Sequence, residues 1–386
     1  MTLREQTMKA ISAILQSSTN SMLFQYEMYP LARFVFVMFS ATIAALGTVG
    51  NLLLVYIFVT RRYPNTPPTL YPLILAMLDT LMCTLYILLF GVDAAVVFLH
   101  VESLFVLYYS YIVPAFVLSR MTQLAIPYML IFATLERFVW INPSGHAVLQ
   151  KMYSTRGRYV TVGVTLFVCA CLRLPTAWAT KVFEHESCPD FFRTKTTGAA
   201  EWVGESFVYH ILDFHFLSIV QTVVPFFVLL TFNVIIVRKL TTAKANCSDV
   251  PIGHYSPKCQ TSPTDSLPTA ALVQKSSLRR QMSTSLKSAV YTMVAIVTSY
   301  IFSNSLHLCL TVLERSDSTL LKHPTDPELA STFHTTFSDV VSFVYMFTSA
   351  IRILIYYQCN TAIRNDLRDM FISWFTGYDK KEIVMV

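Results

Sequence analysis

The sequence predicts an all-α membrane protein, a bundle of seven transmembrane helices followed by a short amphipathic helix. Of its 386 residues, 54% are hydrophobic and only 13% are charged, whereas roughly a quarter of a soluble domain is charged. Seven apolar stretches can each cross about 30 Å of hydrocarbon, which takes about 20 helical residues. Charges inside these stretches are isolated, so lipid is expected to be the solvent for most of the chain.

Taken in order, the chain is a tail, a helical domain and a second tail. Residues 1–30 are polar and are predicted to be an irregular extracellular tail. Residues 31–358 form the seven-helix domain, in which residues 241–287, rich in Pro, Ser and Thr, are predicted to be a disordered third cytoplasmic loop. Residues 359–386 form the amphipathic helix and a cytoplasmic tail. The predicted spans are 33–60, 70–92, 105–136, 158–180, 209–238, 288–313 and 336–357.

The distribution of basic residues predicts the orientation. Lys and Arg are concentrated in the loops that follow the first, third and fifth spans, and such loops face the cytoplasm in membrane proteins. The amino terminus is therefore expected outside and the carboxyl terminus inside. The outer loops are acidic, which favours a cationic ligand; an ordinary solvated surface that the same bias leaves acidic is the alternative.

Two polar side chains lie within the first two spans. Asn51 is expected to hydrogen-bond to another helix, unless it is an amide tolerated near a helix end. Asp79 lies near the bilayer centre, where a carboxylate is costly unless it faces the bundle interior with a partner. A protonated Asp79 that only holds helices together is the alternative.

The inner end of the third span places an acid beside a base. Glu136 and Arg137 must meet water, each other or a partner protein, because apolar surroundings satisfy neither group. On a helical projection, Ser119 and Gln123 share the face of Arg137 and are candidates for an outer cavity. Arg120 is turned away by about 100°, so it either enters a cavity or extends to the headgroups.

The remaining spans add further polar residues. Arg173 is expected to extend to the headgroups from the outer part of its helix. Pro225 is expected to bend the fifth span. In the last span Ser349, Arg352 and Tyr356 share a face, so the guanidinium is expected to look inward. After Cys359, a candidate for palmitoylation, an apolar stripe predicts a helix on the inner membrane surface: Ile363, Leu367, Met370, Phe371 and Trp374.

With these residues in place, the chain resembles the rhodopsin-like class of G-protein-coupled receptors over about residues 30–375. The similar elements are Gly50-Asn51, Leu75 to Asp79, Glu136-Arg137-Phe138 in place of Asp-Arg-Tyr, Pro225 with Asn233, and Ser349 to Tyr356 in place of Asn-Pro-x-x-Tyr. Within that class, Tyr300 to Leu306, which contains Asn304, is similar to a motif of invertebrate receptors for FMRFamide-like neuropeptides.

The resemblance implies a cell-surface receptor in the plasma membrane that signals to a heterotrimeric G protein. Coupling would involve Glu136, Arg137, Phe138, Asn233 and Tyr356, and the polar core would be Asn51, Asp79, Asn304, Ser349 and Arg352. An amidated peptide would bring a cation to Asp93, Asp213 or Asp339. The ligand-pocket candidates are these three together with Ser119, Arg120, Gln123 and His307.

Two other functions are alternatives to a peptide receptor. A chemosensory receptor for a small molecule is the alternative within the same class. A seven-span transporter is the alternative outside it, although the sequence shows neither an internal repeat nor Gly-rich broken helices. No enzyme motif is present, and we expect no metal, cofactor or nucleic acid as a partner.

The chain departs from the receptor pattern at several positions. Ile112 stands where the family has the Cys of its outer disulfide, so Cys188 is expected to lack that partner. Arg352 stands where the family has Asn, and Ile126 replaces a Ser that, with the acid matching Asp79, holds a sodium ion. We therefore expect an ion pair between Asp79 and Arg352 that replaces sodium.

Overall fold

The computed structural model describes residues 3–60, 69–141, 151–185, 191–248, 269–316, 319–321 and 331–376. Seven helical segments in this part of the chain are long and apolar enough to cross a membrane, which makes the chain a multi-pass membrane protein of the predicted class. Their ends lie within four residues of the predicted ones, except that the second span continues to Leu99, seven residues past its predicted end at 92. The spans are Leu31–Thr60, Leu70–Leu99, Glu102–Val139, Thr155–Ala179, Phe207–Arg238, Ser288–Glu314 and Thr332–Cys359.

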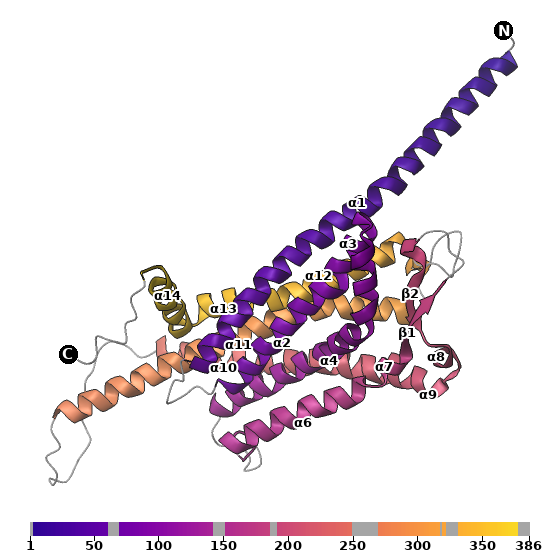
Figure 1. Ribbon diagram of the computed structural model, residues 1–386. Coiled ribbons are helices and arrows are strands. Elements are labelled where there is room, and N and C mark those ends of the chain that lie inside the picture. The colour runs from indigo at the N-terminus through magenta and orange to yellow at the C-terminus, as the bar shows by residue number, and fades with distance from the viewer. Residues whose placement is uncertain are drawn as a thin grey trace.

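The long helices run along one common direction as a bundle (Figure 1). Some spans consist of consecutive helical segments, where η marks short 3₁₀ or π turns. In chain order the elements are α1 (Leu3–Thr60), α2 (Leu70–Tyr86), η1 (Ile87–Gly91), α3 (Val92–Leu99), α4 (Glu102–Ile141), α6 (Thr155–Arg173), α7 (Thr176–Ala179), β1 (Thr180–Glu184), η2 (Phe191–Arg193), β2 (Lys195–Ala199), α8 (Glu201–Glu205), α9 (Phe207–His210), η3 (Ile211–Leu217), η4 (Ile219–Val223), α10 (Val224–Ser248), α11 (Thr269–Arg315), η5 (Thr319–Leu321), α12 (Thr332–Ala350), α13 (Arg352–Cys359) and α14 (Thr361–Thr376).

Two segments predicted to be irregular are helical. The helix α1 already begins at Leu3 and projects beyond the bundle (Figure 1), because residues 3–29 contain neither Gly nor Pro and are rich in residues with a high helix propensity. The predicted loop 241–287 is helical over 241–248 and 269–287, because α10 continues beyond the end of the fifth span and α11 begins before the start of the sixth. Extending an existing helix avoids the cost of nucleating a new one. Residues 249–268 lie outside the described residues.

The main hydrophobic core occupies the middle and inner half of the bundle. Its fully buried members come from most of the spans and include Leu54, Leu75, Met129, Leu229 and Ile296. Closer to the outer half, α1 approaches α12 at Gly47, where an added Cβ would lie 2.5 Å from the Cβ of Ala350. Only the absence of a side chain at Gly47 allows this approach.

The fifth span is not a regular α-helix. Its outer half consists of the π-helical turns η3 and η4, and α10 begins one residue before Pro225. Proline cannot donate a backbone hydrogen bond to the preceding turn, and π turns often accompany such interruptions. The predicted bend at Pro225 therefore takes the form of a change in helical register.

A β-hairpin that the sequence reading missed lies at the outer end. Strands β1 and β2 pair antiparallel, with Thr180 opposite Ala199 and Glu184 opposite Lys195. The Lys195 ammonium donates a 2.7 Å hydrogen bond to the Glu184 carboxylate, which lowers the pKa of that carboxyl group. The hairpin forms one wall of the outer cavities described below. Cys188 falls in the segment between the strands that lies outside the described residues.

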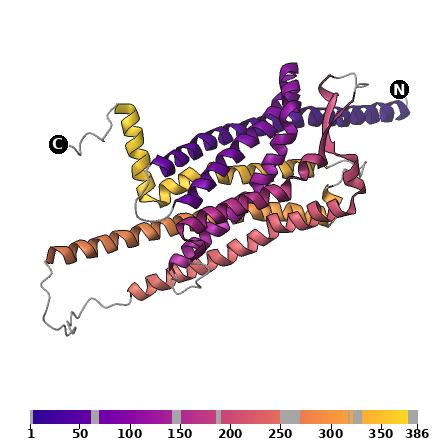
Figure 2. The same cartoon turned by 60° about the horizontal axis from the view of Figure 1, so that its bottom comes forward.

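At the opposite end, α14 lies across the bundle (Figure 2). Three members of its predicted stripe, Ile363, Leu367 and Met370, are buried and belong to the main core, whereas Phe371 is 43% exposed. The helix therefore packs its apolar face partly against the bundle and leaves a remainder of that face exposed. In the same view α10 and α11 continue beyond the other helices at this end.

Candidate functional site

The outer half of the bundle contains a cavity of about 480 Å³, within the range of ligand pockets. Five of the predicted pocket residues line it: Asp93, Ser119, Arg120, Gln123 and His307. Their side chains come from α3, α4 and α11. Ser119 and Gln123 therefore line an outer cavity, as the helical projection of the third span predicts. Of the two positions that the sequence left open for Arg120, the cavity and the headgroups, the structure shows the cavity.

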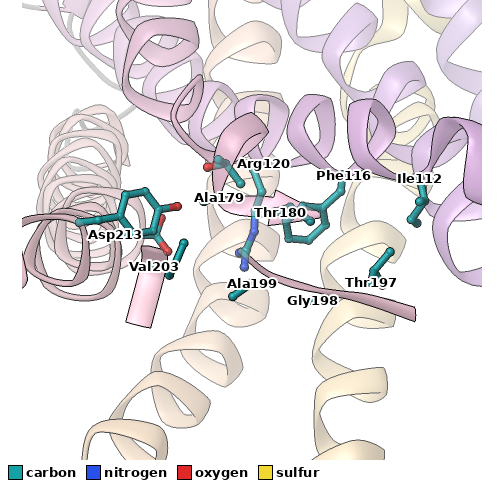
Figure 3. Close-up of a pocket in the computed structure, with 12 residues that line it drawn as sticks. Ile112, Phe116, Arg120, Ala179, Thr180, Thr197, Gly198, Ala199, Val203 and Asp213 are labelled. Carbon is teal, nitrogen blue, oxygen red and sulfur yellow. The ribbon is translucent and has the colours of Figure 1, made fainter. Parts of the chain in front are cut away.

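A second cavity of about 330 Å³ lies under the β-hairpin. Figure 3 shows Arg120 and Phe116 of α4 on one side of it, with Thr197 and Ala199 of β2 on the other. Asp213, a further predicted pocket residue, lines this cavity and a smaller one of about 130 Å³. Arg120 lines all three of these cavities.

Two of the three carboxylates expected to receive a cationic ligand are paired with arginines of the chain itself. The Nε of Arg33 lies 2.7 Å from Oδ2 of Asp339, and Nη1 of Arg173 lies 2.9 Å from Oδ1 of Asp213. The expectation that Asp339 and Asp213 would await the cation of a ligand is therefore not supported. Asp93 makes no ion pair with another described residue.

The expectation that Arg173 extends to the headgroups is wrong. Its side chain is only 5% exposed and turns inward, where it also donates a hydrogen bond to Gln221. Gln221 in turn donates to Gln123 at 3.5 Å, and Tyr345 donates to the backbone carbonyl of Gln123 at 3.3 Å. Asp213 and Gln221 accept charge-assisted hydrogen bonds from the guanidinium, which hold it inside the bundle.

The middle of the bundle contains the predicted ion pair. The Arg352 guanidinium of α13 donates a hydrogen bond to the Asp79 carboxylate of α2, and both residues are essentially inaccessible to solvent, at 1% and 0% exposure. A buried charge pair is tolerated because each ion supplies the counter-charge of the other. Ile126 is buried in the main hydrophobic core.

Two buried amides link helices near this pair. Asn51 donates to the backbone carbonyls of Gly47 and Ser349, at 2.9 and 3.0 Å, so it joins α1 to α12 as expected. Asn304 of α11 donates at 3.0 Å to the carbonyl of Thr222, in the π turn that precedes Pro225. Each amide thus satisfies a carbonyl of a neighbouring helix, which fixes their relative position.

The inner end contains a second charged group, formed by Glu136, Arg137 and Arg158. Glu136 is fully buried and Arg137 is 3% exposed. The Nε of Arg158 in α6 lies 2.5 Å from Oε1 of Glu136, whereas Nη1 of Arg137 lies 3.8 Å from Oε2. Two guanidiniums therefore share one carboxylate. The closer contact is made by Arg158, which the sequence analysis did not assign to this site.

The other residues predicted to act at the inner end are spread over the surrounding helices. Phe138 packs against Phe232, with ring centroids 5.8 Å apart. Asn233 donates to the Thr298 hydroxyl at 3.0 Å, which joins α10 to α11. Tyr356 is buried and its ring meets Phe58 edge-on at 5.5 Å. These residues lie around the charged group. Among the described residues, no side-chain hydrogen bond joins them to it.

Arg33, Arg158 and Gln221 belong to these sites and were not predicted from the sequence. Arg158 could have been found as a base at the start of the fourth span, level with Glu136 at the end of the third. Gln221 is a buried amide one turn before Pro225 and carries the same signal as Asn51. Cys359 is partly exposed with a free thiol, and its palmitoylation stays a prediction. Among the described residues, no three His, Cys, Asp or Glu side chains are grouped to hold a metal ion.

Comparison with models of protein families finds no match, and comparison with curated protein sequences finds no relative.

Proposed function

We propose that the chain is a receptor of the rhodopsin-like type, which binds a ligand in its outer cavity and activates a heterotrimeric G protein at its inner end. The observation that carries this proposal is the position of Arg137. Its guanidinium is buried at the inner end of α4 beside a carboxylate, while the same helix lines the outer cavity with Ser119, Arg120 and Gln123. One helix thus connects a ligand-sized cavity to a charged group at the opposite end.

The mechanism is a shift between two arrangements of the helices. A ligand that binds one arrangement better increases its population by no more than the difference in binding free energy. Going from 1% to 99% of the active form takes about 5.5 kcal/mol of differential affinity. In the active arrangement Arg137 leaves Glu136 and contacts the G protein, and Arg158 remains as the partner of the carboxylate. This second partner lowers the cost of the exchange, because Glu136 is not left as a buried unpaired charge.

The orientation of the chain in the membrane is part of the proposal. The basic loops place the amino terminus outside, so the cavity faces the extracellular side and Arg137 the cytoplasm. An epitope at the amino terminus is expected to be labelled on intact cells, and an epitope at the carboxyl terminus only after permeabilisation. Labelling of both ends on intact cells would contradict the proposal.

The decisive experiment measures nucleotide exchange on heterotrimeric G proteins in cells with confirmed receptor at the surface. Pools of amidated and free-acid peptides serve as ligands, and each main class of Gα subunit is present in turn. We expect at least one pool to stimulate exchange and Arg137→Ala to abolish that response. Arg156→Ala, which removes an exposed arginine from the same end of the molecule, is the matched control and should retain the response.

Two further measurements keep the result interpretable. Arg137→Lys retains the positive charge and replaces Arg137→Ala if that variant does not reach the surface; it should weaken exchange because it loses the planar guanidinium. A normal response in either variant at normal surface level would refute the assigned role of Arg137. Accumulation of a ligand inside cells without nucleotide exchange would instead favour the transporter.

A further inference from the structure

The arginines that line the outer cavities differ in whether they form an ion pair with a carboxylate. Arg33 and Arg173 each pair with a carboxylate, that of Asp339 and that of Asp213. Arg120 has no carboxylate within 4.0 Å among the residues that the structure describes. The guanidinium of Arg120 lies over the ring of Phe116, and the Cζ of Arg120 is 5.2 Å from the centroid of that ring. The guanidinium is therefore held by an aromatic face on α4 and not by an anion.

The position of Arg120 makes its charge available to a ligand. It lines the cavities of about 480, 330 and 130 Å³, so it stands where they adjoin. In Figure 3 the guanidinium points from α4 toward β2 near Ala199, while Asp213 lies to one side. The side chain is partly buried, which strengthens its interaction with an anion relative to one in bulk water.

The surroundings of Arg120 indicate the rest of the ligand. Phe116, Tyr108, Tyr86 and Phe90 line the same 480 Å³ cavity, and aromatic walls favour an aromatic or apolar body. A guanidinium presents two parallel N–H donors that fit the two oxygens of a carboxylate. A C-terminal amide has one oxygen and no negative charge, so it cannot form this bidentate contact.

We propose that Arg120 binds the carboxylate of an aromatic carboxylic acid whose ring occupies the outer cavity. The acid is either a small molecule or the free carboxyl end of a peptide that terminates in an aromatic residue. This inference deepens the proposed function and rests on it for the identity of the cavity as a ligand site. It differs from the amidated, cationic ligand that the sequence suggested, since Asp213 and Asp339 are already paired and, of the three carboxylates, only Asp93 is left for a cation.

The test compares acids with their own amides on the purified full chain in lipid nanodiscs. The small probes are N-acetylphenylalanine and N-acetylphenylalaninamide. The peptide probes are two pools of the same pentapeptides, all ending in Phe, one with a free carboxyl end and one amidated. The readout is the thermal unfolding midpoint, which rises when a ligand binds the folded form, so it does not depend on a G protein.

We expect the acid of at least one pair to raise the midpoint by several degrees more than its amide. Arg120→Gln should abolish this difference and Arg120→Lys should retain part of it, because Lys keeps the charge but not the fork. Arg156→Gln removes an exposed arginine outside the cavity and should leave the difference intact. A response to the small acid alone identifies a small-molecule ligand, and a response to the peptide acids alone identifies a peptide.

Three outcomes would overturn the inference. They are an amide that stabilises as well as its acid, an unchanged preference in Arg120→Gln, and no stabilisation by any probe up to millimolar concentration. Nucleotide exchange is measured separately with the same probes. An acid that binds through Arg120 but stimulates no G protein would leave the carboxylate site standing and refute the proposed function.

Discussion

The ion pair in the middle of the bundle and the charged group at its inner end differ in how they pair their buried charges. In the middle, one carboxylate, Asp79, faces one guanidinium, Arg352, and both are sealed from solvent. At the inner end one carboxylate, Glu136, is shared by Arg137 and Arg158, and the Arg158 side chain is 16% exposed. The first arrangement pairs one cation with one anion away from solvent, whereas in the second two guanidiniums contact the same carboxylate and the group reaches the surface.

This difference indicates which group can rearrange. Separating Asp79 from Arg352 leaves two buried charges without partners, which costs several kcal/mol each. Moving Arg137 away from Glu136 leaves the carboxylate bound to Arg158, and the contact that the carboxylate loses is the longer one, at 3.8 Å. We infer that the middle pair holds the helices together in both arrangements, while the inner group is the one that changes. The predictions below test this contrast.

The largest expected effect is the loss of one member of the middle pair. Asp79→Asn or Arg352→Gln alone should destabilise the protein by about 3–5 kcal/mol, because each leaves the other charge buried without a partner. The double variant should be more stable than the sum of the two single effects predicts. Thermal unfolding in nanodiscs measures all three. Strict additivity, or stabilisation of the wild type by sodium over potassium, would contradict an ion pair that replaces a sodium site.

A smaller effect on stability and a larger one on signalling are expected at the inner group. Glu136→Gln removes the carboxylate that holds both guanidiniums and should cost about 1–3 kcal/mol, since Arg158 can turn toward water. Basal nucleotide exchange should rise several-fold because the inactive arrangement loses its ionic contact. Glu184→Gln, which removes an exposed carboxylate from the outer hairpin, is the matched control. Equal basal exchange in both variants would show that the inner group does not restrain activity.

The close approach of α1 to α12 provides a test confined to the middle region. Gly47→Ala should destabilise by about 1–3 kcal/mol, because the new Cβ would lie 2.7 Å from the Cα of Ala350 and 2.5 Å from its Cβ. Gly163→Ala has nothing within 4 Å of the new atom and should stabilise by up to about 1 kcal/mol through helix propensity. Basal nucleotide exchange should be unchanged in both. The same unfolding midpoint in the two variants would disprove the close contact.

Hydropathy was sufficient to predict the seven spans and most of their ends within four residues, although the second span continues seven residues beyond its predicted end. Hydropathy depends on composition over long windows, which the bilayer thickness dictates. The pair of Asp79 with Arg352 was also predictable, because each charge lies alone on an inward face and lacks another explanation. The helical extensions of α1, α10 and α11 were not predicted, because their polar composition is typical of irregular segments. The absence of Gly and Pro from these segments is the signal that favours a helix.

The partners of the outer charges could not be predicted from one span at a time. The pairing of Arg173 with Asp213 depends on the π turns of the fifth span, which rotate the residues before Pro225 relative to a regular helix. The hairpin under which Arg120 lies is formed by short strands with weak alternation. Arg158 was missed for a related reason, since its partner Glu136 is near only after the third and fourth spans pack together.

The smallest expected effect concerns the hydrogen bond between Asn233 and Thr298 on the inner half of α10 and α11. Thr298→Val keeps the shape of the side chain and removes the acceptor, so it should destabilise by about 0.6 kcal/mol, the average for such bonds between membrane helices. Thr42→Val, whose hydroxyl bonds only within its own helix, corrects for the loss of a hydroxyl. A small difference between the two would fit an inner end whose helices separate easily. A loss above about 2 kcal/mol would instead show that α10 and α11 are held at the inner end as firmly as the helices in the middle of the bundle. The contrast between the two regions would then fail, because a ligand supplies only a few kcal/mol of differential affinity to separate these helices.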